Sequence, residues 1–200
     1  MTFTSRRENN LEKRRTASET RLLVLMACNR ILRRGVLTDL TLENVAAEAG
    51  LSKGGLLYHF PNKEALIEAL FLHHNQLFEE RVELLAAAED EPLGAWLRAY
   101  AKALIEQIAD PSNASLYASL FAAEEQYVGA HSLMNGKWFQ WERQAKNSGL
   151  DPGRAELVRL AVDGLWFAQM HNYAPPDPAR REQIEEMILQ MTFNPEPLHG

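Results

Sequence analysis

The sequence is poor in the features that mark secreted and membrane proteins. Cys28 is the single cysteine among its 200 residues, which excludes a disulfide within the chain. No apolar run reaches the roughly 18 residues that a membrane-spanning helix needs. The opening stretch MTFTSRRENNLEKRR lacks the apolar core of a signal peptide. These absences predict a cytoplasmic protein without a membrane partner.

Patterns that carry catalysis or bind a metal ion are also missing. There is no glycine-rich phosphate loop, no HExxH pair and no cluster of cysteine and histidine. His73 and His74 are adjacent, so on a helix their side chains point about 100° apart and cannot bind one metal ion together. We therefore expect no enzymatic activity, no cofactor and no metal.

Helical patterns dominate the chain, whereas the period-two alternation of strands is scarce. A capping side chain or an Asp-Pro pair marks most of the helix starts, and glycine or proline marks most of the ends. The expected helices span residues 16–34, 41–50, 52–60, 63–88, 92–109, 112–127, 132–148, 151–173 and 177–191. This pattern predicts an all-α fold of about nine helices.

The expected helices divide the chain into three parts. Residues 1–15 are expected to be a disordered basic arm. Residues 16–62 form a three-helix domain whose connecting helix continues to about residue 80, and residues 80–200 form a larger helical body.

Charge is unevenly divided along the chain. Residues 1–63 carry eleven Lys/Arg against six Asp/Glu, a net +5, and the remaining residues carry ten Lys/Arg against twenty-one Asp/Glu, a net −11. A basic N-terminal third is typical of a protein that binds a polyanion.

The stretch TLENVAAEAGLSKGGLLYHFPNKEAL, residues 41–66, predicts two short helices joined by a tight turn at Gly50. Small alanines on the first helix allow the second to cross it closely, as in a helix-turn-helix. Thr41 and Ser52 cap helices whose N-terminal amides can bind a phosphate. Further groups that suit a DNA groove or backbone are Lys53, Tyr58, His59 and Lys63. We interpret this stretch as an element that binds double-stranded DNA.

The same stretch resembles the DNA-binding domain of TetR-family transcriptional regulators. The matching features are Thr41, Val45-Ala46, Ala49-Gly50, Ser52-Lys53-Gly54, Tyr58-His59-Phe60 and Lys63-Glu64-Ala65-Leu66. The resemblance extends over residues 16–80 or so, and residues 163–166 are similar to a C-terminal segment of some members. It implies a homodimer that binds a palindromic operator and represses transcription until a small molecule binds the C-terminal domain.

The resemblance also implies roles for single residues. Phosphate contacts fall on Thr41, Tyr58, His59 and Lys63, and base-facing positions fall on Lys53, Gly54, Gly55 and Leu57. Family members commonly carry Thr, Ser or Ala where Gly55 stands, and an aromatic where Leu57 stands. Gly55 offers a base no side chain, and Leu57 offers only apolar contact. We therefore expect sequence readout to depend on Lys53, with guanine as its target, and partly on DNA shape.

All four tryptophans follow residue 90. An aromatic-rich helical body suits a pocket for an apolar or aromatic ligand, although aromatics at helical spacing are more often core or interface. On the helices that surround the cavity in the family, the candidate ligand-binding residues are Trp96, Tyr100, Tyr117, Phe121, Trp138 and Phe167. An apolar stripe at helical spacing, together with the helix that the family uses for dimerisation, gives the candidate dimer interface: Leu165, Trp166, Met170, Ile184, Met187, Ile188 and Met191.

Three functions are compatible with the sequence. The first is a dimeric repressor that is released by a small apolar or aromatic effector. The second is an activator or a regulator that responds to no ligand, which the sequence does not distinguish from the first. The third is a helical small-molecule-binding protein in which the helix-turn-helix segment serves only packing. The basic N-terminal third and the spaced match to the family argue against the third function.

Overall fold

The computed structural model describes residues 16–193, so the predicted basic arm, residues 1–15, lies outside it. Within the described range the chain forms helices and no strand, which confirms the all-α fold. In chain order these are α1 (Ala17–Arg34), the short 3-10 helix η1 (Leu37–Asp39), α2 (Leu42–Ala49), α3 (Lys53–His59), α4 (Lys63–Ala87), α5 (Ala95–Ala109), α6 (Asn113–Gln126), α7 (Val128–Lys146), α8 (Pro152–Met170) and α9 (Pro178–Gln190). None of the described helices is both long and apolar enough to cross a membrane.

Side-chain caps begin the helices where the sequence predicts them. At α1 the cap is reciprocal, because the Glu19 amide donates to Thr16 Oγ1 and the Thr16 amide donates to a Glu19 carboxylate oxygen. At other helix starts, an amide three residues on donates to the side chain of Thr41, Ser52, Asn62, Asp151 or Asp177. Each cap satisfies an amide that a helix start leaves unpaired, and contributes about 1 kcal/mol.

Two helix starts differ from the prediction. α5 begins at Ala95 rather than near Pro92, after Gly94, whose left-handed backbone (φ +71°) lets the chain turn into the helix. α7 begins at Val128, so Gly129, which the sequence suggests as a helix stop, lies inside its first turn. Ala130 is fully buried in the first hydrophobic core, and this packing outweighs the low helix propensity of glycine.

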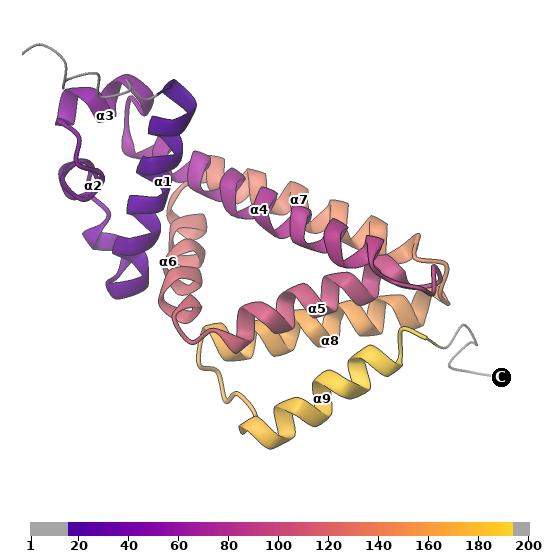
Figure 1. Cartoon of the computed structure of the whole chain (residues 1–200). Helices are drawn as coiled ribbons and strands as arrows, with labels where there is room; N and C mark the ends of the chain where they lie inside the picture. Colours follow the sequence, from indigo (N-terminus) through magenta and orange to yellow (C-terminus); the bar gives the residue numbers. More distant parts are fainter. Residues whose placement is uncertain (1–15, 194–200) are drawn as a thin grey trace, which may run out of the picture.

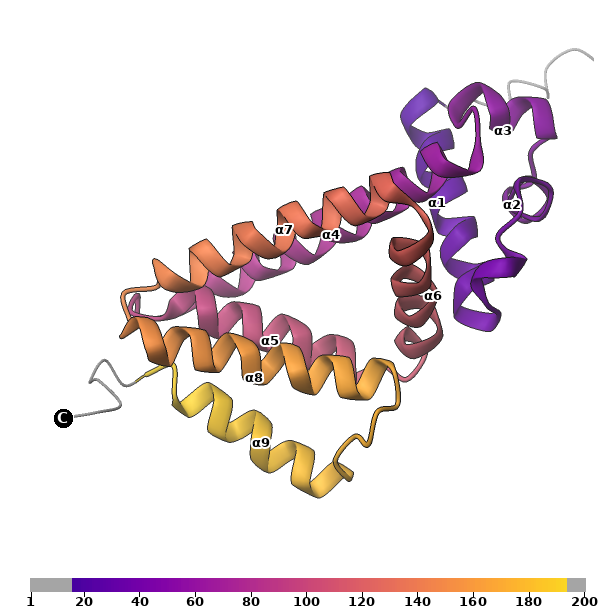
Figure 2. The same ribbon diagram turned by 180° about the vertical axis from the view of Figure 1, so that it is seen from behind.

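α4 passes through two hydrophobic cores. The first core joins α1, α2, α3 and the first half of α4 to buried residues of α6 and to Ala130 of α7. The second core joins the later half of α4 to α5, α7, α8 and Ile188 of α9. α1, α2 and α3 form one end of the molecule, and α4 and α7 lead away from them side by side (Figure 1). Seen from behind, α6 lies between α1 and the far ends of α5 and α8 (Figure 2). A shift of α4 or α6 would therefore move side chains that pack in both cores.

Candidate DNA interface and ligand cavity

The turn between α2 and α3 depends on Gly50. Its backbone is left-handed (φ +66°, ψ +33°), and its amide donates to the carbonyl groups of Ala46 and Ala47. Any residue with a Cβ would be strained in this conformation. The side chains that hold the two helices together are buried: Val45, Ala46, Ala49 and Leu56. The result is a helix-turn-helix with α3 as its second helix.

The exposed side of α3 carries Lys53 and Tyr58, the latter 84% exposed. Lys53 Nζ lies 2.6 Å from Glu43 Oε1 of α2, and both side chains are more than half exposed. An exposed ion pair of this kind contributes little to stability, so a DNA group can replace the carboxylate at small cost. The sequence prediction missed Glu43, whose pKa is lowered mainly by the hydrogen bond from Lys53.

The capping hydroxyls of the two helices are already engaged. Thr41 Oγ1 accepts from the Asn44 amide, and Ser52 Oγ accepts from the Gly55 amide, each at 3.1 Å. Each hydroxyl keeps its own proton to donate, so a phosphate at either helix start can meet the hydroxyl as well as the remaining amides. Among the predicted base-facing positions, Gly54 is exposed, whereas Gly55 and Leu57 are half-buried.

Arg21 of α1 supports the end of α3, a contact that the sequence did not predict. Its Nη1 donates to the carbonyl oxygen of His59 at 2.7 Å, and its guanidinium carbon lies 4.3 Å from the centre of the Phe60 ring. The half-buried His59 ring meets the Tyr58 ring edge to face, with 5.1 Å between centroids. Lys63 is half-buried in the first turn of α4. The predicted DNA-binding residues thus all lie on or beside the helix-turn-helix, and their role stays a prediction.

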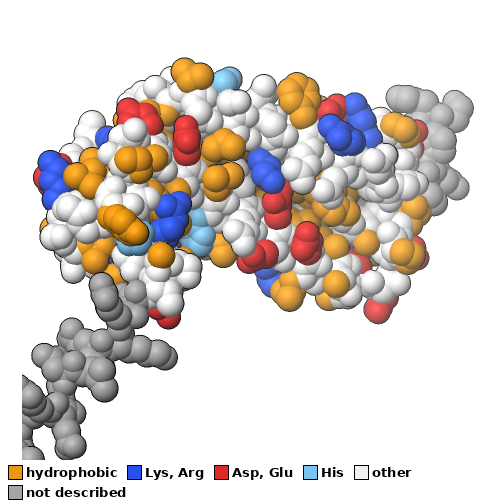
Figure 3. Space-filling view, turned by 90° about the horizontal axis from the view of Figure 1, so that it is seen from above, with side chains coloured by type: hydrophobic (Ala, Val, Ile, Leu, Met, Phe, Trp, Pro, Cys, Tyr) orange, Lys and Arg blue, Asp and Glu red, His pale blue; other side chains and the backbone are white. Residues whose placement is uncertain are grey.

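Much of the positive charge at this end is paired within the chain. Arg30 Nε lies 2.6 Å from Glu48 Oε1, and Arg34 binds the other carboxylate oxygen. These two arginines hold the pKa of Glu48 at about 2. Residues 16–63 carry six Lys/Arg against four acids, since the other five basic residues of the N-terminal third fall within residues 1–15. In the view from above, basic side chains are interspersed with acidic and apolar ones (Figure 3).

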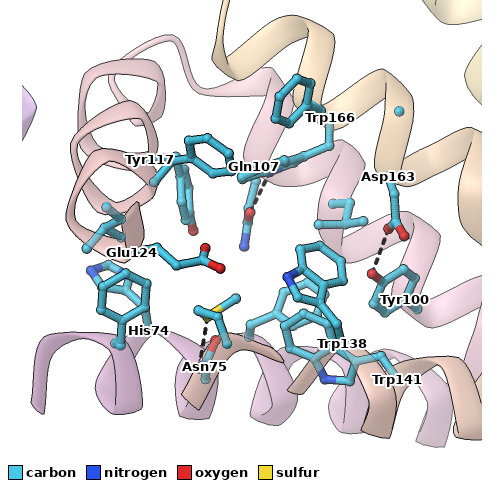
Figure 4. A pocket seen from close by; sticks show the side chains of 18 of the residues that line it. His74, Asn75, Tyr100, Gln107, Tyr117, Glu124, Trp138, Trp141, Asp163 and Trp166 are labelled. Carbon is cyan, nitrogen blue, oxygen red and sulfur yellow. Dashed lines mark hydrogen bonds between the residues drawn. The ribbon is translucent and has the colours of Figure 1, made fainter. Parts of the chain in front are cut away.

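The C-terminal body encloses a cavity of about 440 Å³, the size of pockets that bind drug-sized ligands (Figure 4). Its wall is built from α4, α5, α6, α7 and α8, and most of the lining side chains are apolar or aromatic. Five of the six predicted ligand-binding residues line it: Tyr100, Tyr117, Phe121, Trp138 and Phe167. The structure therefore brings these aromatics together around one space, as ligand binding would require.

Trp96 is the exception, because it does not belong to the cavity wall. Its ring stacks on Tyr100, with 5.2 Å between centroids, and packs against the second core. Trp166, predicted at the dimer interface, also lines the cavity, and its part in a dimer stays a prediction. Helical spacing could have placed Trp166 in the cavity wall, because Asp163, Trp166 and Phe167 are three and four residues apart and so share one face of α8.

Hydrogen bonds fix two sides of the cavity wall. The Tyr100 hydroxyl donates to Asp163 Oδ1 at 2.7 Å, and Arg159 Nη1 donates to the other carboxylate oxygen at 2.8 Å. Burial raises the pKa of Asp163 to about 6 and that of Tyr100 well above its usual value. The Trp166 indole N–H donates to Gln107 Oε1 at 2.9 Å. The walls are thus held in place before any ligand enters.

His74 connects the cavity to α1. It lines the cavity, and its Nε2 donates to Asn29 Oδ1 at 2.7 Å. Burial lowers the pKa of His74 to about 4, so the ring is neutral at physiological pH. The Tyr117 ring meets it edge to face, with 6.0 Å between centroids. One wall residue therefore contacts a helix of the DNA-binding end directly.

The predicted dimer residues do not form one exposed stripe. Leu165, Met170 and Ile188 are buried in the second core of the chain itself, and their part in a dimer interface stays a prediction. Ile184 and Met191 are half-buried against the same core. The physical reason is that α9 packs on α5 and α8 and turns much of its apolar face inward. On α8 and α9 the exposed large apolar side chains are Leu157, Leu160, Phe167 and Met187.

Two family models match the chain. One, described as "Bacterial regulatory proteins, tetR family", matches residues 33–70, and the other, described as "Tetracyclin repressor-like, C-terminal domain", matches residues 94–193. The HTH-type transcriptional regulator TtgR of Pseudomonas putida is 32% identical over 98 residues, which are 47% of this chain and 45% of TtgR. The chain thus matches about half the length of this curated relative.

Solved structures share the fold across most of the chain. NalD of Pseudomonas aeruginosa, the secondary repressor of the MexAB-OprM multidrug efflux pump, is 19% identical with a TM-score of 0.63, over 88% of this chain and 96% of NalD. The multidrug binding protein EbrR, solved in complex with imidazole, is 22% identical with a TM-score of 0.64, over 90% of this chain and 92% of EbrR.

Proposed function

This chain belongs to the TetR family of transcriptional regulators, and we propose that it represses transcription as a homodimer on a palindromic operator until a small molecule enters its cavity. It acts in the cytoplasm on double-stranded DNA, and its role is binding rather than catalysis. The effector is a small apolar or aromatic molecule. The repressor NalD and the multidrug binding protein EbrR, which share the fold, support this proposal.

In this proposal α3 enters the major groove. Tyr58 and Lys63 contact phosphates, together with His59 and the capped helix starts at Thr41 and Ser52. Lys53 leaves Glu43 and donates to a guanine, and the exposed backbone at Gly54 allows close approach of the DNA. Support comes from the exposure of Lys53 and Tyr58 and from the weakness of the Lys53–Glu43 pair.

The single observation that carries the ligand response is the hydrogen bond from His74 to Asn29. Asn29 lies on α1, whose buried face forms one core with α2 and α3. A ligand that displaces the His74 ring must break or shift this bond, and α1 then moves with the helix-turn-helix packed on it. Binding in the cavity would thereby change the position of α3.

α6 offers a second connection between the two ends. Arg33, near the end of α1, lies 3.3 Å from an Asp110 carboxylate oxygen and also bonds the Ser112 hydroxyl, just before α6. Tyr117 and Phe121 of α6 line the cavity. A ligand that moves α6 would therefore pull on the same helix, α1, that His74 contacts.

Dimerisation would use the C-terminal helices. Leu157 and Met187 leave apolar surface exposed on α8 and α9, which lie far from α3 (Figure 1). A two-fold axis there would present two copies of α3 to one face of the DNA, about one helical turn (~34 Å) apart. Such a dimer recognises a palindrome because each half-site meets the same surface.

The test is an electrophoretic mobility shift with DNA from upstream of the protein's own gene and with a scrambled fragment of equal composition, both at moderate salt. We expect the chain to prefer the upstream fragment. Lys53→Ala should reduce that preference about tenfold or more, because it removes a base contact. Tyr58→Phe should weaken binding to both fragments similarly, because a phosphate contact carries no sequence information.

Lys146→Ala is the matched control, since Lys146 ends α7 at the opposite end of the molecule and should leave both affinities unchanged. Equal losses on both fragments for Lys53→Ala would refute its role in sequence readout. Absence of any specific shift by the unaltered chain would refute the proposed DNA-binding function.

A further inference from the structure

The cavity carries negative charge that its apolar lining does not explain. Two carboxylates, Glu124 and Asp163, belong to the wall, and among the described residues that line it there is no lysine or arginine. His74, the one histidine of the wall, is neutral at physiological pH because burial lowers its pKa to about 4. Among the described residues, the wall itself therefore presents acidic side chains to a ligand and no lysine or arginine.

The two carboxylates differ in how they are neutralised. Asp163 accepts from Tyr100 on one oxygen and from Arg159 on the other, so its charge is balanced within the protein. Glu124 Oε1 lies 3.4 Å from His131 Nδ1, a long contact to a side chain that is 66% exposed and charged only when protonated. Burial raises the pKa of Glu124, which means that the charged form is held in the wall at a cost. A cation beside it would recover that cost.

The surroundings of Glu124 suit the rest of such a ligand. Figure 4 shows its carboxylate pointing into the open space between Tyr117, Gln107 and Trp138. Gln107 uses its oxygen for the Trp166 indole, so its amide nitrogen is the end turned toward this space. Aromatic faces attract cations as well as flat apolar rings, and the effect grows when water is excluded.

We propose that the cavity binds an aromatic organic cation, with its ammonium group at Glu124 and its ring among Tyr117, Trp138 and Trp166. This inference rests on the proposed function, and it names the chemical class of the effector for the same site. Carboxylates and phosphates are disfavoured, because they would place a second negative charge next to Glu124 away from water. Neutral aromatics fit the walls but bring no positive charge to the Glu124 carboxylate.

Isothermal titration calorimetry of the full chain with three probes of one shape tests this proposal. The probes are 2-naphthylmethylamine, which is a cation at pH 7, the neutral 2-naphthylmethanol and the anionic 2-naphthoate. We expect the amine to bind about tenfold more tightly than the alcohol, because hydrogen bonds to a charged group are the stronger ones. The naphthoate should bind most weakly.

Glu124→Gln keeps the shape of the side chain and removes its charge, so it should abolish the preference for the amine over the alcohol. Glu125→Gln is the matched control, because Glu125 is exposed on the same helix and does not line the cavity. It should retain the full preference. Thermal unfolding of both variants checks that the fold is kept.

Equal affinity for the amine and the alcohol, tighter binding of the naphthoate, or no binding of any probe would each overturn the proposal. So would a preference for the amine that survives Glu124→Gln. None of these outcomes alters the mobility shift described above, which uses no ligand, so failure of the effector class is distinguishable from failure of the DNA-binding function.

Discussion

Ion pairs and hydrogen bonds within the chain determine which side chains are available to DNA and to a ligand. Lys53 is held by Glu43 through an exposed ion pair that DNA can replace. Asp163 is held by Tyr100 and Arg159 inside the protein and so is withdrawn from ligand chemistry. The sequence did not reveal these pairings, because the partners of Lys53 and Tyr100 lie 10 and 63 residues away on other helices.

His74 should make stability depend on pH. In the folded chain its pKa is about 4, whereas in the unfolded chain it returns to about 6.5. Between these values the unfolded state binds the proton more readily, so this histidine makes the folded state less stable as pH falls from 6.5 to 4. The full effect is about 3 kcal/mol. Urea unfolding of the unaltered chain and of His74→Gln, from pH 7 down to pH 4.5, measures it.

The comparison with His74→Gln is needed because Asp163 acts in the opposite sense. Its pKa of about 6 lies above the unfolded value, so the folded chain binds its proton first and gains stability as pH falls through the same range. The variant keeps Asp163, and the difference between the two proteins isolates His74. Parallel pH curves for the two proteins would contradict the buried, neutral state of the ring.

At the level of single helices, capping side chains explain where most of the helices begin. The capping side chains of α1, α2, α3, α4, α8 and α9 are visible in the sequence, and the structure uses each of them. The start of α7 was not predictable in this way. It is set by burial of Ala130 in the first core, whose members on α1 and α4 lie far away in the sequence, and this tertiary packing outweighs the local signal of Gly129.

The two glycines of α3 should respond differently to alanine. A Cβ at Gly54 would meet nothing within 4 Å, so Gly54→Ala should stabilise the chain by up to about 1 kcal/mol through helix propensity alone. A Cβ at Gly55 would lie 3.2 Å from Ser52 Oγ, the acceptor that caps α3. Gly55→Ala should therefore gain less, because the cap must shift. Thermal unfolding of the two variants compares them, and a larger gain for Gly55→Ala would contradict the cap geometry.

The cavity was predictable in kind but not in detail. Aromatic richness after residue 90 and the family resemblance together point to Tyr100, Tyr117 and their neighbours, which do line it. The polar members, His74 and Glu124 among them, carried no signal in the sequence. A polar residue on an amphipathic helix reads as solvent-facing unless the position of the neighbouring helices is known.

For the whole molecule, the arrangement of two cores along α4 explains why the helix-turn-helix is visible in the sequence and why the partner of the apolar faces of α8 and α9 is not. The helix-turn-helix is a local unit, so its residues appear together in the sequence and in space. The buried apolar residues of α8 and α9 pack in the chain's own second core. Periodicity shows only that such a face is buried, and burial against the same chain or against a partner gives the same pattern.

The same arrangement places the cavity against the helix that carries the DNA-reading end. His74 of the wall bonds Asn29 of α1, and Arg33 ties the end of α1 to the residues before α6. In the proposed function, occupancy of the cavity and the position of α3 are therefore coupled through α1 and α6. By linkage, a ligand that weakens DNA binding must itself bind more weakly to the DNA-bound protein.

The measurement that tests this account most directly is a titration of 2-naphthylmethylamine into the complex of the chain with a fluorescently labelled upstream DNA fragment, followed by fluorescence anisotropy. We expect anisotropy to fall to the value of free DNA as the cavity fills, and Glu124→Gln, still bound to the same DNA, not to be released at the same amine concentration. An unaltered chain that binds the amine by calorimetry yet stays on its DNA at saturation would contradict the coupling of cavity and α3.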